Sequence, residues 1–336
     1  MDLTEAEIQV LASIRNIEAN GNVADDSALA KRGERYWIFK EDWTNVCEQL
    51  AEKGLVAGSS SGWSLTDDGR PLGDEYRAER ADMYWYYYQR FYTAAHASKA
   101  HTELCKRVFG EDLTQEGQTD MASLGFALDC LPLGPDKSML DLGCGAGVIA
   151  EYVSDKTGAA VTGLDYSSTA IAAADARTSS KRSRLSFRSE NFNSMTPKEG
   201  AYDAILSLDT LYWATDLKGV INVLAKSLKP QGRMALFMNH HVGANEPAEQ
   251  LKHENSGLGK AVASLGLNAQ VYDFSANIGA FWERIYAAAT ALKTTFEAEG
   301  NGFIAESLIR ESEEDYLPDV HAGRIARYLF VIDAPQ

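Results

Sequence analysis

Hydrophobic residues near the start of the chain recur at the spacing of α-helices. The stretch 4–20 keeps this period behind a Thr-x-x-Glu capping box that begins at Thr4. Two further helices are predicted at 26–32 and 41–53, and the glycine-rich stretch 54–72 alternates like a short hairpin. A small, mostly helical domain that ends in a two-stranded hairpin is therefore expected.

From Ser138 onward the pattern changes to short apolar runs that alternate with helices, as in "SMLDLG", "AAVTGLD" and "YDAILSLDTLYW". This alternation is typical of βαβ units on a parallel sheet, so the predicted fold class is α/β. Before it, residues 81–135 are expected to form linking helices around a polar loop from Gly110 to Thr119.

Nearly ninety residues separate Asn239 from the last predicted strand. They include the long helix "GAFWERIYAAATALKTTFEAEGN" and a second helix rich in Glu, which predicts a helical insertion at about 243–325 over the substrate side. Its candidate contributions are Phe281, Trp282, Arg284 and Tyr286. The alternative is that these residues are the core of the insertion, and we prefer it for Phe281 and Ile285, which share an apolar stripe.

The net charge argues against some kinds of partner, and the cysteine positions argue against a metal site. The 336 residues carry a formal net charge of −16, which repels phosphate backbones and anionic membranes, so neither nucleic acid nor a membrane is an expected partner. No apolar run reaches the roughly 18 residues of a membrane span, and the acidic start "MDLTEAEIQV" is unlike a targeting peptide, so we expect a cytoplasmic protein. The four cysteines form no CxxC or Cys/His cluster, which disfavours a metal site.

The stretch 83–92, "MYWYYYQRFY", holds seven aromatic rings in ten positions. On a helix these rings cover at least two faces, which indicates a helix buried between parts of the molecule or between subunits. The alternative is that some rings form the wall of a ligand pocket. Tyr88 and Tyr92, one turn apart on a common face, are the candidates for that role.

The phrase "MLDLGCGAGVIAEYV" places a predicted strand directly before Gly143, Gly145 and Gly147 and a helix directly after them. Glycines there let the backbone turn sharply and approach a ligand closely. The spacing is GxGxG, with Val148 where a dinucleotide-binding loop has its third glycine. Asp165 ends the next strand, where a carboxylate can accept both hydroxyls of a ribose.

These features resemble the class I S-adenosylmethionine-dependent methyltransferases, from about residue 138 to 240 and again in the last segment, "GRIARYLFVIDA". The resemblance implies a Rossmann-like seven-stranded sheet with an antiparallel final strand, and S-adenosyl-L-methionine as cofactor. By resemblance, the cofactor-binding residues are Asp141, Gly143, Cys144, Gly145 and Gly147 near the methionine portion, Asp165 at the ribose, Tyr166, Asn191 and Phe192 around the adenine, and Asp209 beside the methyl group. Many relatives carry aspartate at the position of Asn191, which is a departure here.

Methyl transfer is an in-line displacement, in which the protein positions the nucleophile. Where the nucleophile carries a proton, the protein also removes that proton. No metal is required. At the carboxyl ends of the strands the candidate bases are Asp209, Tyr212, His240 and His241. Asp209 has the alternative role of binding the methionine amino group. The two histidines have the alternative of only capping the strand or facing water.

The stretch "EQLAEKGLVAGSSSGWSLTDDGR" resembles the end of a winged-helix domain. Residues 1–80 carry nine basic and sixteen acidic residues, however, and such an acidic surface would repel the phosphate groups of DNA. We therefore expect this winged-helix-like domain to serve dimerisation, giving a homodimer, or to act as a lid. Residues 81–135 would then supply part of the active-site cover, and 136–336 the methyltransferase domain.

The leading functional hypothesis is an enzyme that methylates a small molecule at nitrogen or oxygen. One alternative is a regulator in which the winged helix binds DNA and the Rossmann-like part only senses the cofactor. Another is a methyltransferase that acts on a protein or RNA. The acidic N-terminal surface counts against the first, and the lack of a basic channel counts against the second.

Overall fold

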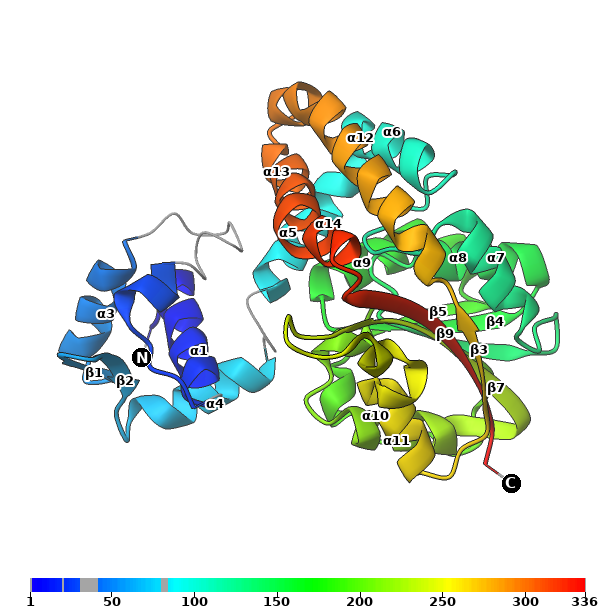
Figure 1. Ribbon diagram of the computed structural model, residues 1–336, viewed down its shortest axis with the longest axis horizontal. Helices are drawn as coiled ribbons and strands as arrows, with labels where there is room; N and C mark the ends of the chain where they lie inside the picture. Colours follow the sequence, from blue (N-terminus) through cyan, green and yellow to red (C-terminus); the bar gives the residue numbers. More distant parts are fainter. Residues whose placement is uncertain (1, 20, 31–41, 80–83, 336) are drawn as a thin grey trace. The chain divides into compact units, whose positions relative to one another are not determined.

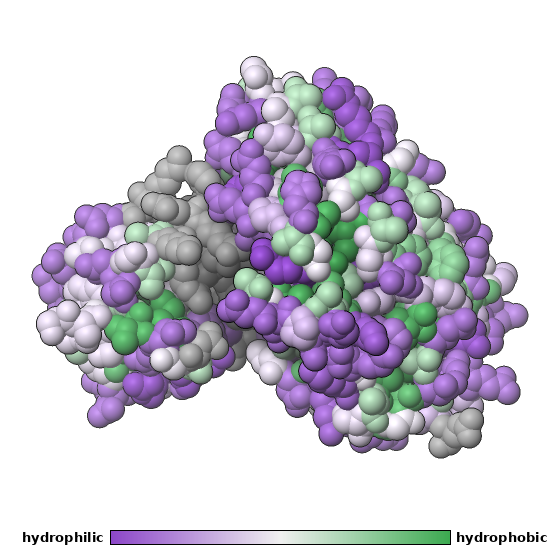
Figure 2. Space-filling view, in the orientation of Figure 1, coloured by the Kyte–Doolittle hydropathy of each residue, from purple (hydrophilic) through white to green (hydrophobic). Residues whose placement is uncertain are grey.

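The structure, a computed structural model, describes residues 2–19, 21–30, 42–79 and 84–335. It divides into two compact units, Met1–Phe91 and Tyr92–Gln336, with the boundary inside helix α5 (Tyr84–Ala97) (Figure 1). On the face drawn in Figure 2, hydrophilic residues predominate on both units, in keeping with the high net charge.

The N-terminal unit contains helices followed by a hairpin, as the sequence pattern predicts, but a further helix, which was not predicted, follows the hairpin. Its elements are α1 (Glu5–Ala19), α3 (Trp43–Glu52), β1 (Val56–Ser59), β2 (Gly62–Leu65) and α4 (Gly69–Glu79), with β1 and β2 antiparallel. Residues 26–30 are helical, and the rest of the predicted second helix lies outside the described residues. The likeness to a winged-helix domain stays a prediction.

Local contacts explain where these N-terminal helices begin and how they pack. The capping box of α1 is confirmed, because the Glu7 N–H donates to Thr4 Oγ1 at 3.2 Å and the Thr4 N–H donates to Glu7 Oε2 at 2.8 Å. Helix α3 begins after Asp42, whose carboxylate accepts from the first free backbone N–H groups. The helices bury one apolar core that includes Leu11, Ile14 and Leu50.

The C-terminal unit is built on a seven-stranded sheet with the order β5-β4-β3-β6-β7-β9-β8. Strands β3 to β7 are parallel, while β9 runs antiparallel to β7 and β8. The strands are β3 (Ser138–Leu142), β4 (Ala160–Asp165), β5 (Leu185–Ser189), β6 (Tyr202–Leu208), β7 (Leu228–His241), β8 (Ala269–Asp273) and β9 (Ile325–Asp333). This arrangement confirms the predicted α/β fold with a Rossmann-like sheet.

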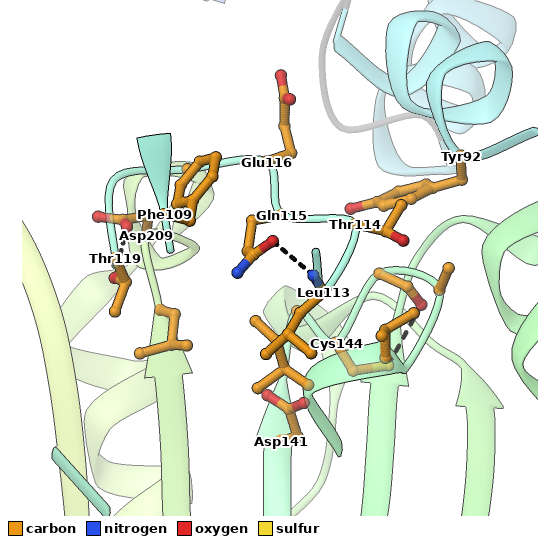
Figure 3. Close-up of a pocket in the computed structure, with 17 residues that line it drawn as sticks. Tyr92, Phe109, Leu113, Thr114, Gln115, Glu116, Thr119, Asp141, Cys144 and Asp209 are labelled. Carbon is orange, nitrogen blue, oxygen red and sulfur yellow. Dashed lines mark hydrogen bonds between the residues drawn. The ribbon is translucent and has the colours of Figure 1, made fainter. Parts of the chain in front are cut away.

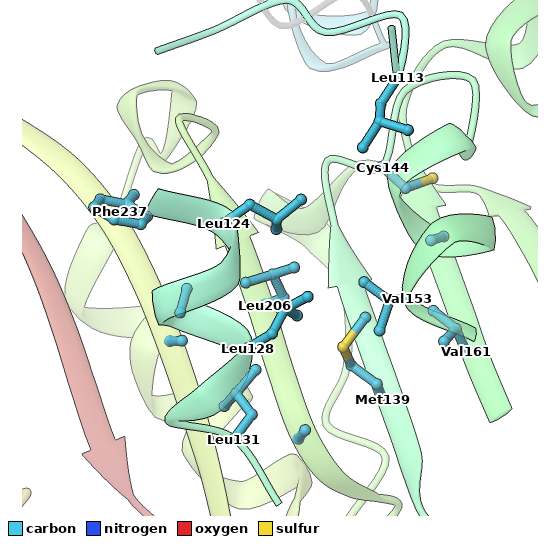
Figure 4. Packing of buried hydrophobic residues seen from close by; sticks show 14 of the residues in the cluster. Leu113, Leu124, Leu128, Leu131, Met139, Cys144, Val153, Val161, Leu206 and Phe237 are labelled. Atoms are coloured by element: carbon cyan, nitrogen blue, oxygen red, sulfur yellow. The ribbon is translucent and has the colours of Figure 1, made fainter. Parts of the chain in front are cut away.

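Helices cover both faces of this sheet because successive side chains of a strand point to opposite faces. Met139 packs with α7 (Met121–Asp129) and α8 (Val148–Thr157), and Figure 4 shows Leu124 and Leu128 of α7 directed at it and at Leu206. The next residue, Leu140, packs on the other face with α10 (Leu217–Ser227) and α11 (Gly257–Ser264). The remaining elements of the sheet region are α6 (Lys99–Val108), α9 (Ser168–Arg177), η1 (Ser179–Lys181), η2 (Phe192–Ser194) and η3 (Leu211–Trp213).

The stretch predicted as a helical insertion, 243–325, is not helical throughout, since it also contributes the edge strand β8 to the sheet. Its other elements are η4 (Ala248–Leu251), η5 (His253–Asn255), η6 (Ser275–Asn277), α12 (Ile278–Ala298), α13 (Gly302–Arg310), the π-helix η7 (Glu311–Tyr316) and α14 (Leu317–His321). Phe281 and Ile285 are buried, as preferred from the sequence, and so is Trp282. None of the described helices is long and apolar enough to cross a membrane.

Candidate functional site

The strand order reverses between β3 and β6, and ligands of open α/β sheets bind outside the carboxyl ends of the strands at such a point. The glycine loop, residues 143–147, lies there between β3 and α8. Gly143 and Gly145 have φ of 76° and 53°, a region that residues with a Cβ rarely adopt. A Cβ on Gly145 would lie 2.6 Å from the ring of Tyr92, so glycine is required there for space as well as for conformation.

Two buried aspartates stand beside the glycine loop. Asp165, at the end of β4, accepts hydrogen bonds from the N–H groups of Gly145 at 2.9 Å and Ser167 at 2.8 Å. Burial raises its pKa to about 6 despite these bonds. Asp141 is buried at the end of β3, and its Oδ2 atom has no hydrogen-bond partner among the described residues. Burial, reinforced by Asp165, raises the pKa of Asp141 to about 7.

A cavity that is partly open to solvent lies between the glycine loop and the end of β6. Residues 113–119, here called the covering loop, close it from above, and Figure 3 shows Gln115 bonded to Leu113 and Glu116 directed away from the strands. The lining residues are Tyr92, Phe109, Leu113, Thr114, Gln115, Glu116, Gly117, Thr119, Asp141, Gly143, Cys144, Gly145, Ala146, Val148, Ile149, Leu208 and Asp209.

The tyrosines that the sequence singled out are placed differently. Tyr92 belongs to the C-terminal unit and extends from α5 above the glycine loop toward the covering loop (Figure 3). Burial, followed by the carboxylates of Asp165 and Glu116, raises the pKa of Tyr92 well above its usual value, so the phenol stays protonated. Tyr88 belongs to the N-terminal unit, where its ring packs edge-on against Tyr87 at 5.4 Å between centroids.

The other rings of the aromatic stretch serve packing where they are described. Tyr87 and Phe91 are buried and stack on each other with ring centroids 5.6 Å apart. The side chains at 84–86 lie outside the described part of the chain. The expected interface between subunits stays a prediction.

Asp209 lies at the end of β6 with φ of 55°, which is uncommon for a residue with a side chain. Its carboxylate forms a two-pronged ion pair with Arg327 of β9, at 2.6 Å between Nη1 and Oδ1 and 2.9 Å between Nη2 and Oδ2. It also accepts from the Gln118 N–H at 2.9 Å and from Thr119 Oγ1 at 3.0 Å. A carboxylate with this many donors is better suited to anchoring than to removing a proton.

The three other candidate bases are also engaged in hydrogen bonds. Tyr212 lies with its hydroxyl 3.4 Å from Asp209 Oδ1 and accepts from the Asn239 N–H at 2.7 Å, and burial raises its pKa. His240 Nε2 lies 2.7 Å from the Gln250 carbonyl oxygen. His241 Nδ1 lies 2.9 Å from an Asp319 carboxylate oxygen. None of these three residues lines the cavity, and for His241, which is exposed, this favours the alternative of a strand cap.

The remaining predicted cofactor residues, apart from Cys144, do not line the cavity. Gly147 caps α8, and Tyr166 is half-buried directly after Asp165. Asn191 caps η2 by accepting from the Asn193 N–H at 3.0 Å, and Phe192 packs against the core beside it. The Cys144 thiol is buried, and burial raises its pKa well above the usual value, so it is a packing group whose backbone shapes the loop.

Sequence reasoning missed the covering loop, which was expected only as a polar connection. The polar side chains of Gln115, Gln118 and Thr119 are buried in it. The sequence signal was a run of polar residues around Gly117 between two helices, which is also the signature of an ordinary exposed loop. Gln118 and Thr119 contact Asp209 and Arg327, which lie far away in the sequence.

Comparisons with known proteins point to methyltransferases. A family described as "Methyltransferase domain" matches residues 139–232. A ubiquinone biosynthesis O-methyltransferase of Rhodopseudomonas palustris is 34% identical over 98 residues, which are 29% of this chain and 38% of that protein. This chain therefore spans less than two fifths of that relative.

Two solved structures show the same fold at low identity. A phosphoethanolamine N-methyltransferase 2 of Haemonchus contortus, solved with phosphomonomethylethanolamine and S-adenosylhomocysteine, has a TM-score of 0.58 at 17% identity, covering 74% of this chain and 60% of that one. The [4+2]-cyclase SpnF has a TM-score of 0.52 at 18% identity, covering 63% of this chain and 80% of that one.

Residues 139–232 therefore match a methyltransferase domain, and the solved structures share the fold of the C-terminal unit. The residues around the cavity fit S-adenosylmethionine, the cofactor that the sequence resemblance implies. The orphaned Asp141 oxygen is a buried acceptor ready for a ligand donor, and the glycine loop is a cradle that a Cβ would fill.

Proposed function

We propose that the protein transfers a methyl group from S-adenosylmethionine to a nitrogen or oxygen atom of a small molecule. The observation that carries the proposal is the shared cavity: the glycine loop and Asp141 line it, and Asp165 is bonded to its rim, within a matched methyltransferase domain. When bound, the cofactor supplies a methyl group activated by a positively charged sulfur.

The chain's own residues bind, orient and exclude water. Asp141 and the glycine loop would hold the methionine portion, and Asp165 the ribose. Burial in a cavity closed by the covering loop strengthens the attraction between these carboxylates and a cationic ligand. Leu113 and Phe109 present apolar surface to the same space and would keep water from the reacting atoms.

The charge of the lining favours an acceptor that is neutral or cationic. The described lining residues include Glu116, Asp141 and Asp209, and none of them is Lys, Arg or His. Arg327 beside the cavity is already occupied by Asp209 and Thr119. An acceptor phosphate would meet acidic neighbours there, so we expect amines or hydroxyl compounds without phosphate.

We further propose that the N-terminal unit supports a homodimer or acts as a lid, and that it does not bind nucleic acid. The acidic excess in residues 1–80 supports this, and the exposed Val23 offers apolar surface for a protein contact.

The activity is tested with purified full-length protein and S-adenosylmethionine carrying a labelled methyl group. Calorimetry with the cofactor comes first, and then incubation with a panel of amines and phenols, each with and without a phosphate group. Label transfer to unphosphorylated members supports the proposal. Absence of cofactor binding, or a product formed without loss of the labelled methyl group from the cofactor, contradicts it.

A further inference from the structure

We propose that Asp209 and Arg327 are positioning residues that latch the covering loop over the cofactor cavity, so that cofactor retention depends on this ion pair. The inference rests on the proposed function, because it assigns the latch to the cavity that would hold the cofactor. It goes beyond the predicted roles of Asp209 as a base or as a ligand of the methionine amino group.

The covering loop is bound to the sheet through one carboxylate. Asp209 Oδ2 accepts from the Gln118 N–H at 2.9 Å and from Thr119 Oγ1 at 3.0 Å. A Cβ on Gly117, which has φ of 145°, would lie 3.2 Å from the same oxygen, so the loop backbone passes directly against it. The last three residues of the loop therefore lie where Asp209 places them.

Arg327 holds that carboxylate in place. The guanidinium occupies both carboxylate oxygens and also donates from Nη2 to Thr119 Oγ1 at 2.9 Å. The two side chains are 5% and 4% exposed, so the pair is shielded from competing water. The Thr119 hydroxyl thus donates to one partner and accepts from the other, which ties the loop to both members of the pair.

A second layer of contacts reinforces the latch from the insertion. The Gln118 side-chain oxygen accepts from Asn239 Nδ2 at 2.8 Å and from Trp282 Nε1 at 3.1 Å. Its amide nitrogen donates to Tyr316 of the π-helix at 3.1 Å, and the Tyr316 ring stacks on Trp282. These contacts connect the covering loop to α12 and η7 as well as to the sheet.

Stability alone is a weak reason for this arrangement. A buried ion pair often stabilises a fold no better than apolar residues of the same shape, and Asp209 in addition holds a left-handed backbone conformation. Residues held in such sparsely populated backbone conformations cluster at active sites and ligand clamps. Here Asp209 lines the cavity and also bonds the loop that closes it.

The test compares full-length wild type with Arg327→Lys, Thr119→Val and a control. Lysine keeps the charge but loses the two-pronged contact, and valine keeps the size of Thr119 but loses its hydroxyl. The matched control is Arg233→Lys. Arg233, on β7, forms an exposed ion pair with Asp333, which lies on β9 like Arg327. The dissociation rate of S-adenosylhomocysteine is measured by competition in a stopped-flow instrument, together with hydrogen exchange of the amides at 113–119.

We expect dissociation to be about tenfold faster in both latch variants, with exchange increased at 113–119 but not in β3 or β6, and no change in the control. Unchanged dissociation with unchanged exchange at 113–119 in folded variants overturns the latch. Exchange that rises equally in β3 and β6 also overturns it, since the pair would then be only structural. If Arg327→Lys does not fold, Thr119→Val alone decides. Wild type that does not bind S-adenosylhomocysteine refutes the proposed function instead.

Discussion

The backbone N–H of Gly145 donates to Oδ2 of Asp165 at 2.9 Å, which ties the glycine loop after β3 to the end of the neighbouring strand β4. The same carboxylate would receive the ribose hydroxyls of the cofactor. A ligand at this position would therefore be bound by the Asp165 carboxylate, which also fixes the shape of the glycine loop.

Replacement of Asp165 should weaken cofactor binding. We expect Asp165→Ala to cost roughly 1 to 3 kcal/mol of binding free energy, because ribose hydroxyls would be left unpaired. Calorimetry with S-adenosylmethionine measures this, and Asp136→Ala, which removes an exposed aspartate, is the control. Equal affinities of the two variants would contradict the assignment.

The buried Asp141 should make the stability of the cofactor-free protein depend on pH. Its pKa rises from 3.8 to about 7 on folding, so the folded protein holds this proton more tightly than the unfolded chain. Its contribution to the free energy of unfolding therefore falls as the pH rises between these two values. Because Asn resembles the protonated acid, Asp141→Asn should be more stable than wild type at pH 8, and by a clearly smaller margin at pH 5.

Urea denaturation at the two pH values measures this difference. The same variant should bind the cofactor more weakly, since the orphaned Oδ2 acceptor is lost. A stability difference that is identical at both pH values would show that Asp141 does not titrate in this range.

Removal of the Tyr92 hydroxyl should slow turnover more than it affects the fold. We expect Tyr92→Phe to lower kcat at least about tenfold, or roughly 1.4 kcal/mol in the barrier, with a Tm close to that of wild type. We expect the same for Tyr88→Phe. Tyr87→Phe is the control, because Tyr87 is buried against Phe91 and should affect neither quantity. If all three variants behave alike, the aromatic stretch serves packing only.

A side chain at Gly145 should weaken cofactor binding through a clash as well as through backbone strain. A Cβ there would overlap the Tyr92 ring, so Gly145→Ala should weaken binding at least about tenfold. Gly200→Ala isolates the backbone cost, because Gly200 has a similar φ of 58° and no neighbour within 4 Å of an added Cβ. Binding by Gly145→Ala at wild-type strength would rule out the loop as the cofactor cradle.

The N-terminal unit should determine assembly. We expect the full-length chain to be a homodimer in light scattering, and a chain lacking residues 1–80 to be monomeric or prone to aggregate. A full-length chain that is monomeric at tens of micromolar would place the aromatic helix within one subunit. A gel shift at physiological salt that showed specific DNA binding would instead revive the regulator hypothesis.

The sequence by itself determined the features that depend on neighbours along the chain. Short apolar runs that alternate with helical stretches predicted the parallel sheet, because parallel strands need a crossover connection that is usually a helix. The glycine spacing located the turn after β3, since left-handed backbone favours glycine whatever the surroundings. Asp165 was identified in the same way, as an acid at a strand end.

Only the tertiary structure decided which polar groups meet. Asp209 and Arg327 are 118 residues apart, and nothing local indicates that the first is neutralised by the second. The burial of Gln118 depends on Asn239 and Trp282, which arrive from other elements. A carboxylate that already accepts several hydrogen bonds is an anchor, whereas one without them can act as a base. Because the donors come from residues distant in the sequence, only the folded chain shows which of the two it is.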